Sequence, residues 1–518
     1  MIDDTSASLK VSVVVPAYNS GTHIERLVDS LVRQSMPPTQ FEAIFVDDGS
    51  TDDTPARLDA LAAAHPHFRV LHIDNSGWPS RPRNVGVAHA RGEYVVFVDD
   101  DDWLGDEALD RMYGIGATHG ADVVIGRMAG HGGRGVPREL FRKNRFDATV
   151  ANAPLIDSLT CHKMFRRAFL DEHELRFPEQ WPRRLEDHRM VVRAYLLSKR
   201  TCVLSDYTCY HHSRRDDGGN VTADQLDPGE YYAALREALD IVDAHVEPGP
   251  LRDRLYRRWL RHQMLDRLRG RRLLEAPQAW VGQVAAEVRD IIRERFGPGV
   301  AAGLPPMYRV LAHLAEQDRL ADVRRLAEWE QALRAAALVE RHALAGTTLT
   351  LTVAAWLESD GRPVAAGRTG DRDLLVLPVE NVPAELRDVT EALVQGRVDV
   401  VARRQGTGDE VFLPVTSTVE RVVGPDGTAH AVHRATVTVD YRTVNAGRTA
   451  GMWRLKARVT SLARTQDVRL PLLVRCATDG APPRVVDETA FLTRLRQAVR
   501  RRVPAGLRAL PALRGRRG

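Results

Sequence analysis

The sequence of 518 residues has no long apolar run and few cysteines. No stretch approaches the roughly 18 to 20 apolar residues that a membrane-spanning helix needs. Residues 1–10 carry two aspartates and no apolar segment of the kind found in a secretory signal. Cysteine occurs at Cys161, Cys202, Cys209 and Cys476. This spacing fits neither a zinc site nor a secreted disulfide scaffold, so we expect free thiols and a cytoplasmic protein.

Lysine is also scarce, and the net charge of +4 is unevenly distributed. Residues 489–518 carry nine arginines and no acidic residue, so the rest of the chain is net negative. The basic character is therefore local and predicts no nucleic-acid partner. Within this tail, Phe491, Leu495 and Val499 recur at helical spacing. This pattern favours a basic amphipathic helix in peripheral contact with the anionic inner face of a membrane. A solvated charge run and a contact with a polyanion are the alternatives.

The first part of the chain alternates between short apolar runs and amphipathic stretches. The runs between residues 11 and 101 read VSVVV, EAIFV, RVLHI and YVVFV. Between the first two runs, apolar residues recur at helical spacing, at Ile24, Leu27, Val28 and Leu31. This alternation is typical of βαβ units and predicts an α/β fold with a largely parallel sheet.

The periodicity changes twice further along the chain. We predict that the α/β domain covers residues 1–225. Helical spacing interrupted by prolines then predicts a helical connector domain over residues 226–345. Alternating apolar residues predict a β-sandwich over residues 346–480, and residues 481–518 form the basic tail.

Each of the four predicted strands of the first domain ends in polar or turn-forming residues. The segments PAYN, DDGS, DNSG and DDDD occupy residues 16–19, 47–50, 74–77 and 99–102. In an open α/β sheet, ligands bind where the carboxyl ends of parallel strands meet. The sequence therefore predicts a binding site at this edge.

The run of aspartates at residues 99–102 follows a strand that we expect to be buried. Adjacent carboxylates repel one another, so a folded protein keeps them in water or around a cation. A solvated turn is the alternative, but burial of the preceding strand favours a cation. Few protein ligands and open positions suit Mg²⁺ or Mn²⁺.

Other polar residues allow both a functional and a structural interpretation. Asp48 fits a ligand contact or a helix cap, and Arg83 fits a phosphate contact or a surface loop. Glu186 and Asp187 could act in the site or only complement a helix dipole. His212 could contact phosphate or metal, or be structural.

Taken together, these motifs resemble family 2 glycosyltransferases of the GT-A, Rossmann-like nucleotide-sugar fold. The resemblance is carried by VSVVVPAYN, FVDDGSTDDT, PRNVGVAHARGEYVVFVDDDDWL and LEDH. A narrower resemblance, to bacterial enzymes that put N-acetylglucosamine on the ribitol phosphate of wall teichoic acid, is carried by NSGWPSRPRNVG, DVVIGRMAGHGGRGVPRELF and LTCHKMFRRAFLDEHELRF. Those relatives carry a C-terminal immunoglobulin-like part that some use to trimerise. The resemblance therefore implies an immunoglobulin-like β-sandwich and a homo-oligomer, with a trimer as first candidate.

The family pattern implies roles for the residues at the strand ends. It places substrate contacts at Pro16, Tyr18 and Asp48 around uridine, at Asn75 and Arg83 near the nucleotide and diphosphate, and at Asp99 and Asp100 near the ribose. The pattern usually has a small residue at position 100, where this chain has aspartate. Which carboxylates contact the cation therefore stays open.

The same pattern implies the residues of the chemical step. Asp187 falls on the catalytic base, and Glu186 beside it holds the sugar or orients the base. Asp101 is the main metal ligand, with Asp99 as a second. From the residues alone, and not from the family pattern, we add His212 as a candidate substrate contact.

The implied reaction is an inverting transfer that depends on Mn²⁺ or Mg²⁺. The first candidate donor is UDP-N-acetylglucosamine, and the acceptor is an anionic polymer such as poly(ribitol phosphate) or a lipid-linked glycan. Transfer to another surface polysaccharide or glycolipid is an alternative. A nucleotidyltransferase, a glycoside hydrolase and a non-catalytic polymer-binding scaffold are the rivals from other classes.

Overall fold

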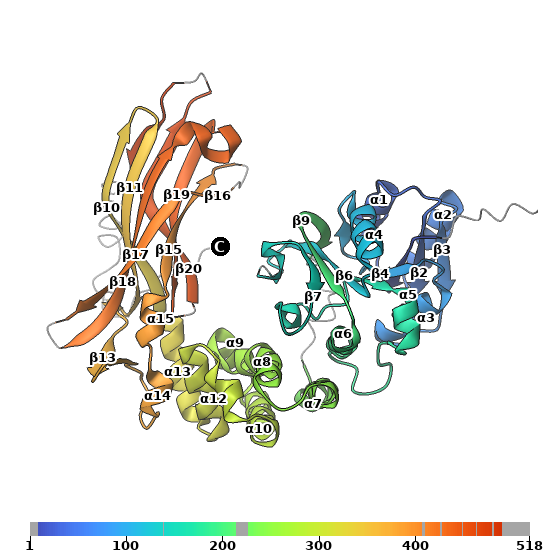
Figure 1. Cartoon of the computed structure of the whole chain (residues 1–518), viewed down its shortest axis with the longest axis horizontal. Helices are drawn as coiled ribbons and strands as arrows, with labels where there is room; N and C mark the ends of the chain where they lie inside the picture. The colour runs from blue at the N-terminus through green and yellow to red at the C-terminus, as the bar shows by residue number, and fades with distance from the viewer. Residues whose placement is uncertain are drawn as a thin grey trace, which may run out of the picture. The chain divides into compact units, whose positions relative to one another are not determined.

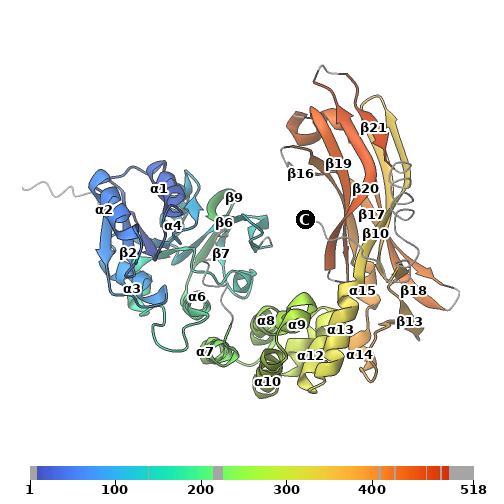
Figure 2. The same cartoon turned by 180° about the vertical axis from the view of Figure 1, so that it is seen from behind.

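The computed structural model forms two compact units. One contains residues up to 266 together with 277–303, and the other contains residues 267–276 together with those from 304 onward. The first unit is coloured from blue to green in Figure 1 and is seen from behind in Figure 2. The structure describes residues 9–137, 139–213, 226–406, 410–424, 427–447, 449–462, 464–478 and 481–488.

A mixed sheet forms the centre of the first unit. Its parallel half has the order β3, β2, β1, β4. The strands are β1 (Val11–Ala17), β2 (Phe41–Asp47), β3 (Phe68–His72) and β4 (Tyr94–Phe97). β1 and β2 are buried at every position, as expected for parallel strands covered on both faces. The predicted α/β sheet is confirmed for these strands.

The other half of the sheet is mixed: β6 and β9 keep the direction of β4, whereas β8, β5 and β7 run the opposite way. β8 runs antiparallel to both β4 and β6, and β6 runs parallel to β9, while β5 and β7 pair with β9. The strands are β5 (Trp103–Leu104), β6 (Val123–Gly130), β7 (Arg145–Ala148), β8 (Met164–Arg166) and β9 (Thr201–His212). Pairing of β5 with the end of β9 brings His212 close to the residues that follow β4.

Helices pack on this sheet through apolar stripes. Ile24, Leu27 and Leu31 are buried on one face of α1, as their spacing predicts. Gly86 of α3 lies against the Val14 side chain of β1. The helices are α1 (Ile24–Val32), α2 (Thr54–Ala64), α3 (Ser80–His89), α4 (Ala108–His119), α5 (Arg167–Glu172) and α6 (Glu186–Leu197).

The helical region is divided between the two units. The first unit holds α7 (Pro228–His245), α8 (Pro250–Trp259), α10 (Gln278–Arg295) and α11 (Pro298–Ala302). The second unit holds α9 (Gly270–Glu275), α12 (Pro306–Glu316) and α13 (Leu320–Ala332). Within the described residues, no helix is long and apolar enough to cross a bilayer.

The predicted end of the helical connector at residue 345 is wrong. Helix α13 ends at Ala332, and β10 (Leu333–Ala345) pairs with β11 (Thr348–Ser359) along its whole length. The β10 sequence is rich in alanine and leucine, which favour a helix. The hydrogen bonds and packing offered by β11 outweigh that local preference.

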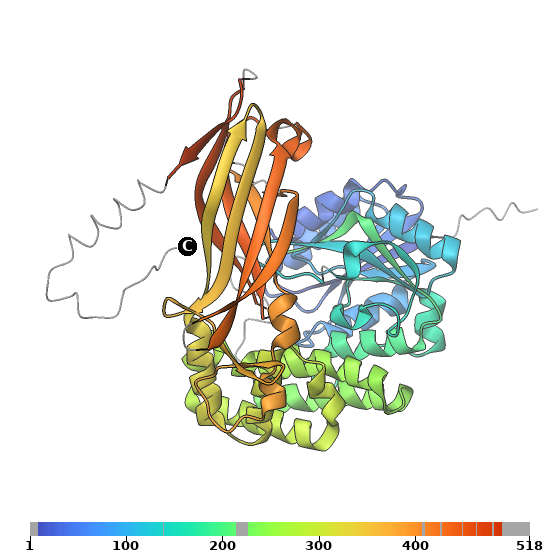
Figure 3. The same ribbon diagram turned by 60° about the vertical axis from the view of Figure 1, so that its left-hand side comes forward.

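The second unit contains a two-layer β region. One sheet has the order β10, β11, β18, β13, β14, and the other has the order β16, β15, β19, β20, β21. Their inner faces share one apolar core, which includes Leu351 of β11, Val437 of β18, Leu455 of β19 and Leu472 of β20. Figure 3 shows the two layers in yellow to red.

The remaining elements of this unit are short or belong to the two sheets. They are β12 (Arg362–Pro363), β13 (Ala366–Thr369), β14 (Arg372–Leu375), α14 (Ala384–Arg387), α15 (Thr390–Val394), β15 (Arg397–Arg404), β16 (Glu410–Phe412), β17 (Val415–Val423), β18 (Thr428–Asp440), β19 (Gly451–Ser461), β20 (Arg464–Cys476) and β21 (Arg484–Asp487). β21 pairs with β20, so the predicted tail boundary at residue 481 is corrected: residues 484–487 belong to the sheet. Residues 489–518, where we predict the basic amphipathic helix, lie outside the described residues.

We expect Gly86→Ala to destabilise the first unit, because the added Cβ would lie 2.3 Å from Cγ1 of Val14. Overpacking of this kind costs about 1–3 kcal/mol. Urea unfolding measures the loss. The matched control is Gly114→Ala, a helical glycine of α4 whose Cβ would meet nothing within 4 Å. It should be neutral or slightly stabilising, and equal losses in both variants would contradict the packing argument.

Candidate active site

Asp48 ties the end of β2 to the end of β3. Its Oδ1 accepts a hydrogen bond from the backbone N–H of Ser76 (2.9 Å), and its Oδ2 accepts one from the Ser76 hydroxyl (2.8 Å). Asn75 donates to the Asp48 carbonyl oxygen (2.8 Å). Gly49, at φ 67°, permits this approach, because a Cβ there would lie 2.6 Å from the Asn75 nitrogen. Burial raises the pKa of Asp48.

The predicted nucleotide residues of β1 differ in exposure. Pro16 is buried within the strand, whereas Tyr18, just beyond its end, is 46% exposed and free to meet a ligand from solvent. The capping interpretation of Asp48 is wrong, because α2 begins only at Thr54 and the Asp48 side chain bonds Ser76 instead. The residues after β1, β2 and β3 thus occupy the same edge of the sheet, as the sequence predicts.

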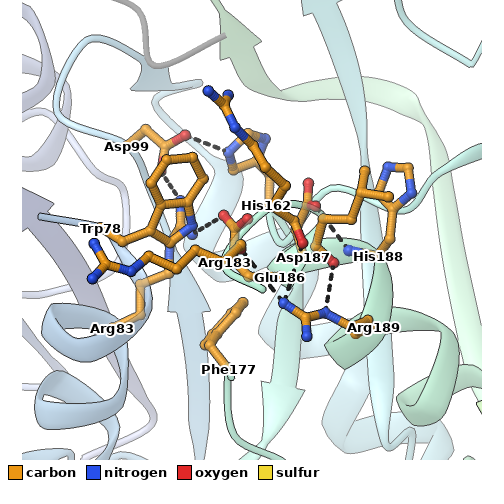
Figure 4. A network of polar contacts seen from close by, with 12 residues as sticks. Trp78, Arg83, Asp99, His162, Phe177, Arg183, Glu186, Asp187, His188 and Arg189 are labelled. Carbon is orange, nitrogen blue, oxygen red and sulfur yellow. Dashed lines mark hydrogen bonds and ion pairs between the residues drawn. The ribbon is translucent and has the colours of Figure 1, made fainter. Parts of the chain in front are cut away.

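Arg83 of α3 is a buried cation between two carboxylates. One of its terminal nitrogens donates to Asp99 (2.8 Å), and the other donates to Glu186 (3.1 Å). The second oxygen of Asp99 lies 2.9 Å from Nε2 of His162. Burial raises the pKa of Asp99, but the charges of Arg83 and His162 outweigh it and hold that pKa well below its usual range. Figure 4 shows these side chains. Because Arg83 is buried and paired with two carboxylates, the surface-loop interpretation of Arg83 is wrong.

Asp187 stands beside Glu186 in the first turn of α6. Its Oδ1 accepts a hydrogen bond from the backbone N–H of His188 (2.8 Å). Burial raises the pKa of Asp187 to about 7, and the charge of Glu186 adds to this while Arg83 and Lys163 oppose it. A carboxylate with a pKa near neutrality suits a general base, because it can both take and release a proton at working pH.

Lys163 is a buried cation that the sequence reasoning missed. Its ammonium donates to the carbonyl of Thr160 and lies 5.9 Å from the centre of the Tyr195 ring. Burial lowers the pKa of Lys163 to about 7, although the charge of Asp187 opposes the shift. Lysine is almost never fully buried without a partner, so there was little reason in the sequence to expect this burial. The one available signal was the position of Lys163 directly after Cys161 and His162.

Asp102 is held by the end of β9. The hydroxyl of Tyr210 donates to its Oδ2 and the backbone N–H of Ser213 donates to its Oδ1, both at 2.6 Å. Burial, together with the charges of Asp99 and Asp101, raises the pKa of Asp102 to about 9. Asp102 therefore has a structural role, and it anchors β9 beside the acidic turn.

Asp101 and His212 are the residues that directly precede the two partners of this contact, Asp102 and Ser213. His212 precedes Ser213, and burial lowers its pKa to about 3, so its imidazole stays neutral. Asp101 is partly buried in the same turn, and the neighbouring Asp100 accepts a hydrogen bond from the Ser20 hydroxyl. A carboxylate and a neutral imidazole are donors that Mn²⁺ accepts, and the concentrated negative charge of the turn favours a cation. The residues therefore fit a divalent metal.

A second group of possible ligands does not fit a metal. One ligand atom each of Asp99, Cys161 and His162 lies within 4.8 Å of the others. Burial raises the pKa of the Cys161 thiol in the absence of a metal. Both oxygens of Asp99 already meet Arg83 and His162. Asp99 and His162 are thus part of the hydrogen-bonded network around Arg83.

Known proteins match this chain in the regions just described. The profile of Glycosyl transferase family 2 matches residues 12–174, and that of the Glycosyl transferase TarS linker domain matches residues 228–327. The solved structure of Staphylococcus aureus TarS 1–349 in complex with UDP-GlcNAc has a TM-score of 0.56 and 28% identity. The match covers 68% of this chain and 98% of that one. The GT-A fold expected from the resemblance is thereby confirmed.

Two curated relatives extend the comparison. The chain is 33% identical over 305 residues to poly(ribitol-phosphate) beta-N-acetylglucosaminyltransferase TarS of Staphylococcus aureus strain Mu50. That match covers 58% of this chain and 52% of the relative, so the chain spans about half the length of that relative. It is 30% identical to the enzyme TarP of strain N315, a match that covers 44% of this chain and 70% of the relative. The chain belongs to glycosyl transferase family 2.

Proposed function

We propose that this protein transfers N-acetylglucosamine from UDP-N-acetylglucosamine to a hydroxyl of poly(ribitol phosphate). The observation that carries this proposal is the placement of Asp187, whose pKa is about 7, beside the buried Glu186–Arg83–Asp99 network at the ligand-binding edge of the sheet. The donor is proposed from the TarS structure solved with UDP-GlcNAc, and the acceptor from the activity named for TarS and TarP.

The nucleotide occupies the edge formed by β1, β2 and β3. The exposed ring of Tyr18 stacks on the uracil, and Pro16 supports the same loop. Asp48 and Asn75, joined by a hydrogen bond, form the floor under the uridine. The carboxylates that follow β4, Asp99 and Asp100, face the ribose, and Arg83 offsets their charge on the side of the diphosphate.

Asp187 acts as the general base. The acceptor oxygen attacks the anomeric carbon while its proton passes to Asp187. The bond from the anomeric carbon to the diphosphate breaks in the same step, so the product has inverted configuration and UDP carries away the electron pair. Glu186, held by Arg83, orients the sugar. A base in this position contributes about 10² to 10⁴-fold to the rate.

Asp101 and His212 would hold Mn²⁺ or Mg²⁺, with Asp99 nearby. A bound cation supplies electrostatic stabilisation of the negative charge that develops on the diphosphate. The role of Asp99 is then to hold Arg83 and His162, because both of its oxygens are engaged with them. We therefore propose Asp101 as the principal carboxylate ligand.

We assign the β region of the second unit a role other than the sugar-transfer reaction. We propose that it is an immunoglobulin-like sandwich through which copies of the chain associate, with a trimer as first candidate, as the family resemblance implies. The apolar core that its two sheets share supports this proposal. Peripheral membrane contact through the arginine-rich residues 489–518 is proposed on sequence grounds alone.

A panel of nucleotide-sugar donors, with poly(ribitol phosphate) as acceptor, tests the reaction. Full-length protein is incubated with Mn²⁺, poly(ribitol phosphate) and one of several nucleotide sugars, and UDP, pyrophosphate and glycosylated polymer are measured. We expect UDP release and polymer modification with UDP-N-acetylglucosamine. Preference for UDP-glucose would change the donor, and pyrophosphate release would indicate a nucleotidyltransferase. Absence of turnover with every donor would reject the transferase.

We expect Asp187→Asn to retain nucleotide binding but lose at least 10²-fold in turnover, because the isosteric amide cannot accept the proton. In the unchanged protein, Asp187 works as a base only when it is deprotonated. Turnover should therefore fall about tenfold per pH unit below the Asp187 pKa of about 7 and level off above that pH. Initial rates and calorimetric UDP binding measure both effects. The exposed Asp110→Asn is the control, and a variant that keeps more than about a tenth of the turnover argues against the base.

Asp101→Asn tests the metal ligand. Loss of one ligand charge should weaken Mn²⁺-dependent binding of the UDP-sugar, whereas binding measured in EDTA should be the same in both proteins. Titration calorimetry with and without Mn²⁺ gives the difference. If Asp101→Asn binds the UDP-sugar normally with Mn²⁺ while the unchanged protein loses binding in EDTA, another residue holds the ion.

A further inference from the structure

The turn of residues 181–185 leads directly into the two carboxylates of the first turn of α6. Its last residue, Leu185, has φ 57° and ψ 30°, a left-handed conformation that is unfavourable for leucine. Such a conformation persists only where the surroundings hold it in place. The positions of Glu186 and Asp187 therefore depend on whatever restrains this turn.

Arg189, one helical turn after Leu185, supplies that restraint. Its guanidinium is buried, and its Nη2 donates to the carbonyl oxygens of Pro182 (2.6 Å) and Arg184 (3.1 Å). Its Nη1 donates to the carboxylate of Glu237 in α7. Figure 4 shows Arg189 beside the start of α6. A planar guanidinium binds several acceptors in fixed directions, which a lysine ammonium does not do.

The helix α7 contacts the same turn a second time. The backbone N–H of Arg183 donates to Oε1 of Glu230, in the first turn of α7 (2.9 Å). Trp259, at the end of α8, donates to Nδ1 of His188, the residue after Asp187 (3.3 Å). Groups on both sides of the catalytic carboxylates are thus held by helices that lie beyond residue 225.

We propose that Arg189 is a positioning residue for Asp187, and that Glu237 and Glu230 make α7 part of the active site. This inference rests on the proposed function, because it assigns a role to residues around its general base. Loss of the guanidinium releases the carbonyls of the turn, and Asp187 leaves its position against the acceptor hydroxyl. A misplacement of about 1 Å can cost 10²-fold in rate. The nucleotide edge, on β1 to β3, stays intact.

Arg189→Met and Arg189→Lys test this role in the full-length protein. We expect Arg189→Met to lower kcat more than tenfold and to change the KM for UDP-N-acetylglucosamine less than threefold. Arg189→Lys should recover only part of kcat, because it keeps the charge without the planar donors. The matched control is Arg236→Met, which removes an arginine of α7 bonded to Glu287 (2.7 Å) and should leave kcat unchanged. A kcat for Arg189→Met within twofold of the unchanged protein overturns the proposal.

The double variant Glu230→Ala/Glu237→Ala keeps the test decisive if Arg189→Met fails to fold, because both glutamates reach solvent. We expect it to lower kcat and to speed amide hydrogen exchange across residues 182–189, while UDP binding stays normal. Unchanged kcat and unchanged exchange overturn the proposal. The exchange measurement needs no turnover, so it separates the two hypotheses. If the unchanged protein transfers no sugar, the proposed function fails, and slow exchange that depends on Glu230 and Glu237 still supports the restraint.

Discussion

The site depends on the enclosure of Arg83 between Asp99 and Glu186. A buried guanidinium is tolerated only when its charge is paired, and loss of one partner of such a pair typically costs about 3–5 kcal/mol. The three residues come from α3, the end of β4 and the start of α6, so one electrostatic requirement fixes three segments. Asp99 extends the network to His162 beside β8. The start of α6 is thereby attached to the parallel half of the sheet.

The same network separates the carboxylates by role. Arg83 and His162 keep Asp99 ionised, whereas burial among like charges raises the pKa of Asp187 to about 7 and that of Asp102 to about 9. One carboxyl is thus held as an anion, one has a pKa near neutrality, and one is hydrogen-bonded at both of its oxygens by the end of β9. When local environments push the pKa values of neighbouring carboxyl groups apart, those groups can take different acid and base roles in one site.

The first unit extends beyond the part that carries the nucleotide edge. The match to the TarS linker domain begins at residue 228, where α7 begins, and α7 bonds both the turn before α6 and Arg189 within it. The contacts of the chain likewise group residues up to 266 with the α/β sheet. A helix that the sequence places in a connector therefore bonds the segment that carries Glu186 and Asp187.

The sequence by itself determined the features that depend on local pattern. Alternating runs predict β1 to β4, and the polar residues after them predict the edge where Asp48 and Asn75 meet, because parallel strands present their carboxyl ends together. Other features depend on partners distant in the chain, which periodicity does not encode. β10 is a strand because β11 pairs with it, against the helical preference of its alanines. The environments of Lys163 and Arg189 and the pairing of Arg83 were decided only by the tertiary structure, since burial and charge pairing arise when separate segments pack together.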